Sequence, residues 1–213
     1  INASYTYEDD CIVGKLLDKI QALPLPKSLD FNEPSDIEGI RALQNSSMIE
    51  HLQVDNKTVA DKIYGAWIGR VAGCILGKPV ENWSKDDIEK LAKADDNYPI
   101  KHYIKGDLPN LKLGNKNMQL VFENGWFAEK FNGYAAADDD TNYTVLSLKI
   151  LETYGRNYST NDIAESWLSN FPLLCLCTAE HAAYRNLVNH IAPPLCAVYR
   201  NPYREWIGAQ IRC

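Results

Sequence analysis

Three consecutive aspartates, Asp138, Asp139 and Asp140, are followed by Thr141 directly before an apolar helical pattern. Adjacent carboxylates repel one another, so such a run is costly in a folded protein unless the carboxylates stay solvated, cap a helix or bind a cation. One or two aspartates are enough to cap a helix. Carboxylate and hydroxyl oxygens on a short turn are ligands that Mg2+ prefers. A solvated acidic cap and a metal site held by these four residues are therefore the two open interpretations.

Four glycines, Gly65, Gly69, Gly73 and Gly77, recur at every fourth position of a second helical pattern. Each glycine inside a helix costs about 1 kcal/mol relative to alanine, so four in register need a compensating reason. The spacing places them on one ridge, where a neighbouring helix or a ligand can approach the backbone closely. Glu81 follows on a predicted turn, where its carboxylate either reaches a site or is an ordinary surface group.

Length, charge and cysteine usage narrow the class of protein. The chain has 213 residues, 46 % of them hydrophobic, which suits one large domain or a domain with an extension. A net charge of -6 and the lack of a basic run argue against nucleic-acid binding. The apolar run around the glycines is short and contains Arg70, which argues against a membrane helix. Six cysteines without zinc-type spacing favour buried, reduced thiols in a cytoplasmic protein.

The periodicity of apolar residues predicts an all-α architecture in two parts. Residues 1–57 are predicted to form a helical N-terminal extension, in which prolines separate two apolar helical stripes. Residues 58–213 form the main body, and residues 95–118 within it are predicted to be a long irregular loop. Strand signals are weak throughout. The main-body helices are predicted over residues 58–76, 84–94, 119–131, 142–154, 160–170 and 178–191.

Three stretches resemble one known family. The stretch from Gly65 to Glu81 resembles the opening helix of the ADP-ribosylglycohydrolases, written GxxxGxxxGDxxGxxxE, and Asp138 to Thr141 resembles their TDDT motif. The stretch 201–212 is similar to their phosphate-binding loop. The resemblance implies an all-α fold of orthogonal helices around two Mg2+ ions. It also implies hydrolysis of the glycosidic bond between ADP-ribose and a protein side chain or another acceptor.

The resemblance assigns expected roles to the residues that match the first two motifs. Asp139 and Asp140 match metal-ligand carboxylates and, with Glu81, are the residues expected to carry catalysis. Thr141 matches the last residue of the metal motif. Asp138 stands where the family usually has threonine, and it is expected to coordinate metal as well. The expected metal ligands are therefore the three aspartates and the threonine.

The resemblance also assigns a substrate-binding role to the stretch near the end of the chain. Asn201, Gly208, Ala209 and Arg212 match the loop expected to hold the diphosphate, where backbone N–H groups and a guanidinium suit anionic oxygens. The expected binding partner is an ADP-ribosylated protein or a small ADP-ribosyl compound. Like Asp138, Cys74 departs from the family pattern, because it stands where the family usually has aspartate.

A second Asp-x-Asp-Ser/Thr motif, which completes the metal site in the family, does not follow the phosphate-loop match in this sequence. The expectation is therefore a C-terminally truncated domain that associates with its missing C-terminal half. A partner chain that supplies the other ligands, and an inactive product, are the alternatives. For the function, the alternative is a non-catalytic ADP-ribose-binding or structural member of the family.

Overall fold

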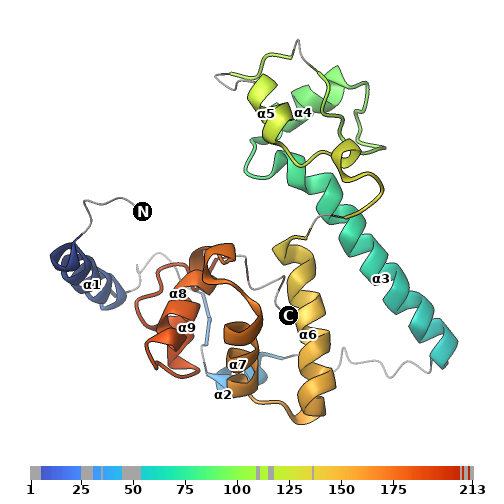
Figure 1. Cartoon of the computed structure of the whole chain (residues 1–213). Coiled ribbons are helices and arrows are strands. Elements are labelled where there is room, and N and C mark those ends of the chain that lie inside the picture. The colour runs from blue at the N-terminus through green and yellow to red at the C-terminus, as the bar shows by residue number, and fades with distance from the viewer. Residues whose placement is uncertain are drawn as a thin grey trace. The chain divides into compact units, whose positions relative to one another are not determined.

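The structure is a computed structural model that describes residues 6–24, 31–34, 36–44, 54–108, 111–114, 118–135, 137–206, 208 and 211. Among these residues, all the regular secondary structure is helical, which confirms the all-α prediction (Figure 1). The chain divides into two compact units. The first joins Ile1–Val54 to Thr153–Ala209, and the second joins Asp55–Glu152 to Gln210–Cys213.

The second unit is built on α3 (Asn56–Gly77), a helix of 22 residues. Its N-terminus is capped by Asp55, whose carboxylate accepts hydrogen bonds from the Thr58 backbone N–H at 2.9 Å and the Thr58 hydroxyl at 2.8 Å. A 3-10 turn, η2 (Lys78–Val80), follows directly and contains a buried proline, Pro79. The helix predicted over residues 58–76 is confirmed, with slightly wider bounds.

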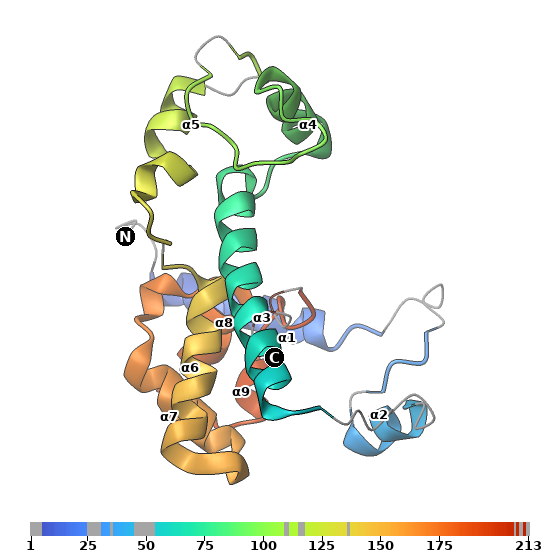
Figure 2. The ribbon, with the colours of Figure 1, turned by 90° about the vertical axis from the view of Figure 1, so that its right-hand side faces the viewer.

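A small core forms at the C-terminal end of α3, where α4 (Lys85–Ala94) and α5 (Met118–Asn124) gather in both views (Figures 1 and 2). Its fully buried side chains are those of Leu91, Ile104, Leu113, Met118 and Phe127. Three of these residues, Ile104, Leu113 and Met118, come from the predicted loop over 95–118, so apolar anchors hold the described part of that loop against α4. Val80 and Trp83, which flank Glu81, pack against the same core and so fix the turn that carries this glutamate.

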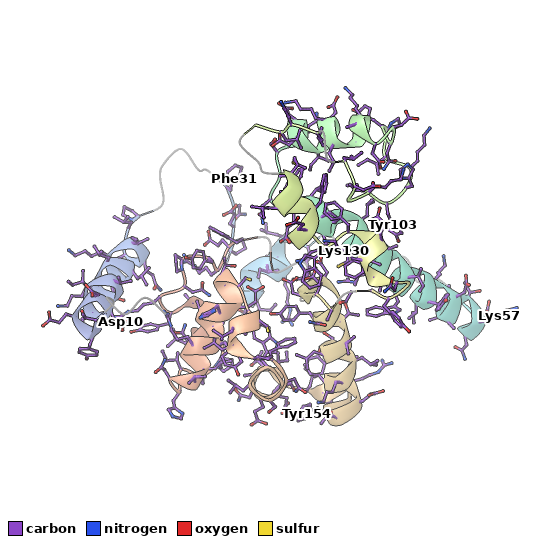
Figure 3. The ribbon with its side chains drawn as sticks, turned by 45° about the horizontal axis from the view of Figure 1, so that its top comes forward. Asp10, Phe31, Lys57, Tyr103, Lys130 and Tyr154 are labelled. Carbon is purple, nitrogen blue, oxygen red and sulfur yellow. The ribbon has the colours of Figure 1, made fainter. Side chains whose placement is uncertain are left out.

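The helix predicted over residues 119–131 is instead two elements, α5 and the 3-10 helix η3 (Ala128–Phe131). The chain turns at Gly125, where an added Cβ would meet the Phe127 ring and lie 2.5 Å from the Val121 carbonyl oxygen. Lys130, labelled in Figure 3, donates to the carbonyl oxygens of Phe122, Glu123 and Gly125. These bonds satisfy the last carbonyls of α5 and end the helix.

The start of α6 (Asp139–Tyr154) lies beside the C-terminal half of α3 (Figure 2). The helix begins three residues earlier than predicted, because the Asp138 carbonyl accepts from the Thr141 N–H at 3.2 Å and the Asn142 N–H at 2.8 Å. Thr141, Tyr143, Leu146 and Ile150 form its buried face. The acidic run therefore lies at a helix N-terminus, as the sequence predicts.

The first unit contains α7 (Thr160–Asn170), α8 (Thr178–Val188) and the short α9 (Leu195–Val198). The buried Asn186 amide joins α8 to α9 by donating to the carbonyls of Cys196 and Tyr199, each at 2.7 Å. This unit also includes α1 (Tyr7–Gln21) and α2 (Ile37–Leu43). These two helices are confirmed, whereas the division at residue 57 stays a prediction.

The prediction that all the cysteines are buried is wrong. Cys196 is buried, but Cys11 and Cys74 are half-buried and Cys175 and Cys177 are exposed; all five are free thiols, and Cys213 lies outside the described residues. The two exposed cysteines flank Leu176, whose side chain is buried. In this apolar segment the central residue therefore points inward and its two neighbours point to the solvent. Among the described helices, none combines the length and the apolar character that crossing a bilayer requires.

Candidate functional site

A cavity of about 430 Å³ lies along the glycine ridge of α3 in the second unit. A Cβ built on Gly69, Gly73 or Gly77 would meet no atom within 4 Å, so no described residue of the second unit packs onto this ridge. Within that unit, the approach of a ligand explains the glycines better than the approach of a helix. The cavity is lined by Gly69, Arg70, Gly73, Cys74, Gly77, Lys78, Glu81 and Asp140.

Both carboxylate oxygens of Asp138 are bonded to side chains from α3 and the turn that follows it. Oδ1 accepts from the Lys78 ammonium at 3.0 Å, and Oδ2 accepts from the Cys74 thiol at 3.3 Å. Burial alone would raise the pKa of Asp138, but the hydrogen bonds from Lys78 and Cys74 outweigh it and hold the pKa below its usual range. Asp138 is therefore an ionised carboxylate whose side chain is only 13 % exposed.

Lys78 bridges two carboxylates. Its Nζ lies 3.0 Å from Asp138 Oδ1 and 3.0 Å from Glu81 Oε2, and Glu81 itself is largely exposed. Burial acts to lower the pKa of Lys78, but the hydrogen bonds to Asp138 and Glu81 raise it above its ordinary value. The ammonium is therefore charged at neutral pH, and it pairs with Glu81, which lines the cavity.

Cys74 contributes a neutral thiol to the site. Burial, followed by the hydrogen bond to Asp138, raises the pKa of Cys74 to about 12. The thiol thus keeps its proton at neutral pH and acts as a hydrogen-bond donor rather than as a thiolate ligand.

Three groups lie close enough together to hold a metal ion. The Cys74 sulfur and one carboxylate oxygen each of Asp138 and Asp140 lie within 4.8 Å of one another. Two of the three are the oxygen donors that a hard divalent cation prefers, and only the protonated thiol does not suit it. The donor set therefore fits a divalent cation through Asp138 and Asp140.

The other two predicted ligands are arranged differently. Asp139 is exposed and outside this cluster, and its Oδ1 accepts the backbone N–H of Asp140 at 3.1 Å. Desolvation of its carboxyl group raises the pKa of Asp139 most, and the charge of Asp138 raises it further. Thr141 is buried, and its hydroxyl donates to the Asp138 carbonyl at 3.0 Å as part of the helix start. Metal binding by these two residues stays a prediction.

Arg70 is a second cationic group of the site that the sequence interpretation missed. Its Nη1 donates to the backbone carbonyl of Asp140 at 3.2 Å, which joins α3 to the start of α6. Arg70, Cys74 and Lys78 are spaced four residues apart, so they form a stripe beside the glycine ridge. That spacing is the signal by which the sequence could have identified them.

The residues of the predicted phosphate loop lie in other surroundings. Asn201, in the first unit, is buried and its amide donates to the carbonyls of Ala179 at 3.0 Å and Ala197 at 2.9 Å. Gly208 is half-buried, and Ala209 and Arg212 lie outside the described residues. Their role in substrate binding stays a prediction.

Comparison with known proteins identifies one family. The family model described as ADP-ribosylglycohydrolase matches residues 55–213, which is more than half of the chain. No curated protein and no solved structure shows a significant match. The matched range begins at Asp55, the residue that caps α3, and contains every residue that lines the cavity.

Proposed function

This chain belongs to the ADP-ribosylglycohydrolase family, and on that premise we propose that it hydrolyses the glycosidic bond of ADP-ribosylated protein or a related ADP-ribosyl compound in a Mg2+-dependent reaction. Family membership supports a glycosidase in general. The observation that carries the proposal is the cavity itself, where carboxylates and cations from α3, η2 and α6 face a glycine ridge. Glycoside hydrolysis needs carboxylates on either side of a sugar, and a bare helix backbone admits one closely.

Arg70 is the group of the cavity that suits a substrate with anionic groups. One N–H group of Arg70 donates to the Asp140 carbonyl oxygen. The other N–H groups of the guanidinium are suited to the oxygens of a diphosphate. The glycine ridge leaves room for the ribose beside these charges. The substrate is therefore expected to place its diphosphate toward Arg70 and its reacting sugar toward Glu81.

Asp138 and Asp140 are the residues that would hold a divalent cation, which supplies a positive charge to bind and polarise the ribose hydroxyls. Glu81 is the general base that takes a proton from the attacking water. Its ion pair with Lys78 holds the side chain beside the cavity that it lines. The remaining negative charge of the acidic run stabilises the positive charge that develops on the sugar as the bond to the leaving group breaks.

A non-catalytic ADP-ribose-binding protein is the second candidate. It is favoured by Cys74, which stands at the usual aspartate position and stays protonated, and by the hydrogen bonds that both oxygens of Asp138 already accept. Such a protein would bind ADP-ribose through Arg70 and the glycine ridge without turnover. Binding and turnover therefore have to be measured separately.

The test measures the release of ADP-ribose from an ADP-ribosylated protein by chromatography, once in the presence of Mg2+ and once in the presence of a chelator. We expect Mg2+-dependent release, and loss of release in Asp139→Ala or Asp140→Ala with little loss of fold. Glu81→Gln should lower turnover more than ADP-ribose affinity. Asp61→Asn, an exposed aspartate elsewhere on α3, is the matched control. Equal release by Asp140→Ala and the parent would reject the metal assignment, and ADP-ribose binding without release would establish the second candidate.

A further inference from the structure

Two carboxylates of the candidate site, those of Asp138 and Glu81, already share a cation, which is the ammonium group of Lys78. The Lys78 ammonium lies 3.0 Å from an oxygen of Asp138 and 3.0 Å from an oxygen of Glu81, and its side chain is 24 % exposed. A positive charge between two carboxylates removes much of the repulsion that otherwise favours binding of a metal ion. Part of the charge that a divalent cation would neutralise is therefore already balanced.

The two hydrogen-bond donors of Asp138 show which group competes most strongly with a metal ion. Lys78 donates to Oδ1 and the Cys74 thiol donates to Oδ2, so a metal ion that binds Asp138 shares an oxygen with one of these donors. The thiol is a neutral and weak donor, whereas the ammonium forms a charge-assisted bond. Lys78 is therefore the stronger of the two competitors.

We propose that Lys78 is a resident cation of this site, which competes with a divalent ion for Asp138 and so sets the metal affinity of the cluster. The inference rests on the proposed function, because it concerns the metal that this function requires. It goes further by giving one residue control over when the metal binds. A substrate diphosphate that draws the ammonium away from Asp138 would free that carboxylate for metal.

The backbone around Lys78 does not depend on its ammonium, so variants of the side chain are suitable tests. The Lys78 N–H donates to the Cys74 carbonyl at the end of α3, Pro79 is buried, and Val80 packs against the core. A neutral side chain at position 78 keeps all three features. Loss of the ammonium therefore changes the charge of the site without removing the turn.

The experiment measures binding of Mn2+, a spectroscopic substitute for Mg2+, from the free-ion electron paramagnetic resonance signal, without any substrate. Lys78→Met should bind Mn2+ on the order of tenfold more tightly than the parent. Lys78→Arg, which keeps the charge, should resemble the parent. The matched control is Lys93→Met, which removes the same charge from an exposed pair with Glu89 on α4 and should leave the affinity unchanged.

Unchanged or weaker Mn2+ binding by Lys78→Met, including no binding by either protein, would overturn the proposal. If Lys78→Met loses its helical circular dichroism, Lys78→Gln provides a second neutral side chain and the same criterion applies. Failure of the proposed function is seen separately, in the ADP-ribose release assay. If Lys78→Met binds Mn2+ more tightly but the parent releases no ADP-ribose, the role of Lys78 is supported and the hydrolase activity is rejected. If the parent releases ADP-ribose but Lys78→Met does not bind Mn2+ more tightly, only the role of Lys78 is rejected.

Discussion

The Cys74 thiol donates to Asp138 Oδ2 across 3.3 Å and thereby connects α3 to the start of α6, although 64 residues separate the two in sequence. An acid at position 74 would add to the crowding of Asp138, Asp139 and Asp140, whereas a protonated thiol offers a hydrogen bond instead. This relationship joins the acidic run to α3 without adding a negative charge.

The first prediction concerns the reactivity of that thiol. Because its pKa is raised to about 12, Cys74 should react with iodoacetamide at pH 8 at least roughly tenfold more slowly than the exposed Cys175 and Cys177. Asp138→Asn removes the negative charge and should speed the alkylation of Cys74. Peptide mass spectrometry over a time course measures each rate. Alkylation of Cys74 at the rate of Cys175 would show that its thiol is not held by Asp138.

The second prediction separates stability from ligand binding at the glycine ridge. Gly73→Ala should raise the free energy of unfolding by about 0.5–1 kcal/mol, because alanine favours a helix and its Cβ would meet no atom within 4 Å. The same methyl group projects into the cavity and should weaken ADP-ribose binding. Gly65→Ala is the control, since Gly65 is on the ridge but does not line the cavity. Urea unfolding and calorimetry test both effects, and equal ADP-ribose affinity in the two variants would contradict the position of the ligand.

The third prediction concerns the turn that ends α5. Gly125→Ala should destabilise the second unit by about 1–3 kcal/mol, because its Cβ would meet the Phe127 ring and the Val121 carbonyl oxygen. Phe127 is fully buried in the core, so it has no room to move aside. Gly69→Ala, where no atom lies within 4 Å, should show the opposite sign in the same urea unfolding experiment. Parent-like stability of Gly125→Ala would mean that the turn is not held as described.

The fourth prediction is a pH dependence in the first unit. Asp18 accepts from Arg200 at 2.8 and 2.7 Å, and chiefly these hydrogen bonds hold the pKa of Asp18 below its usual value. A carboxyl whose pKa is lower in the folded than in the unfolded state stabilises the fold above its ordinary pKa of about 3.9, and that contribution is lost as the pH falls through the lowered value. The pair should therefore protect α1 at neutral pH and not in acid.

Hydrogen exchange of α1 peptides, corrected for the intrinsic rate at each pH, measures this contribution. Asp18→Asn should exchange faster than the parent at pH 7, and the difference should shrink in acid and vanish once Asp18 of the folded parent is protonated. Asp9, in the capping box of α1, also has a lowered pKa and is unchanged in both proteins, so it cancels in the comparison. A difference that persists in acid would show that Asp18 acts other than through its charge.

Helix positions were the most predictable part of the fold. The helix over 160–170 agrees with the structure at both ends, because the capping box of Ser159 and Asp162 marks the start locally. The helix predicted over 119–131 was wrong for a non-local reason. Phe127 is buried in a core shared with α4 and the loop before α5, and burying it requires the chain to turn at Gly125. Periodicity within the segment carries no information about that core.

The sequence by itself determined the helical class, the glycine ridge and the acidic run, because periodicity, capping and the types of neighbouring residues are local properties. Only the tertiary structure decided which groups share the site. Lys78 and Cys74 occupy the two oxygens of Asp138, while the Thr141 hydroxyl turns to the helix start. Which groups bond to Asp138 depends on the contact between the end of α3 and the start of α6, and Lys78 and Asp138 are 60 residues apart in the sequence. Burial and charge act through space in such a contact, so local sequence patterns do not reveal it.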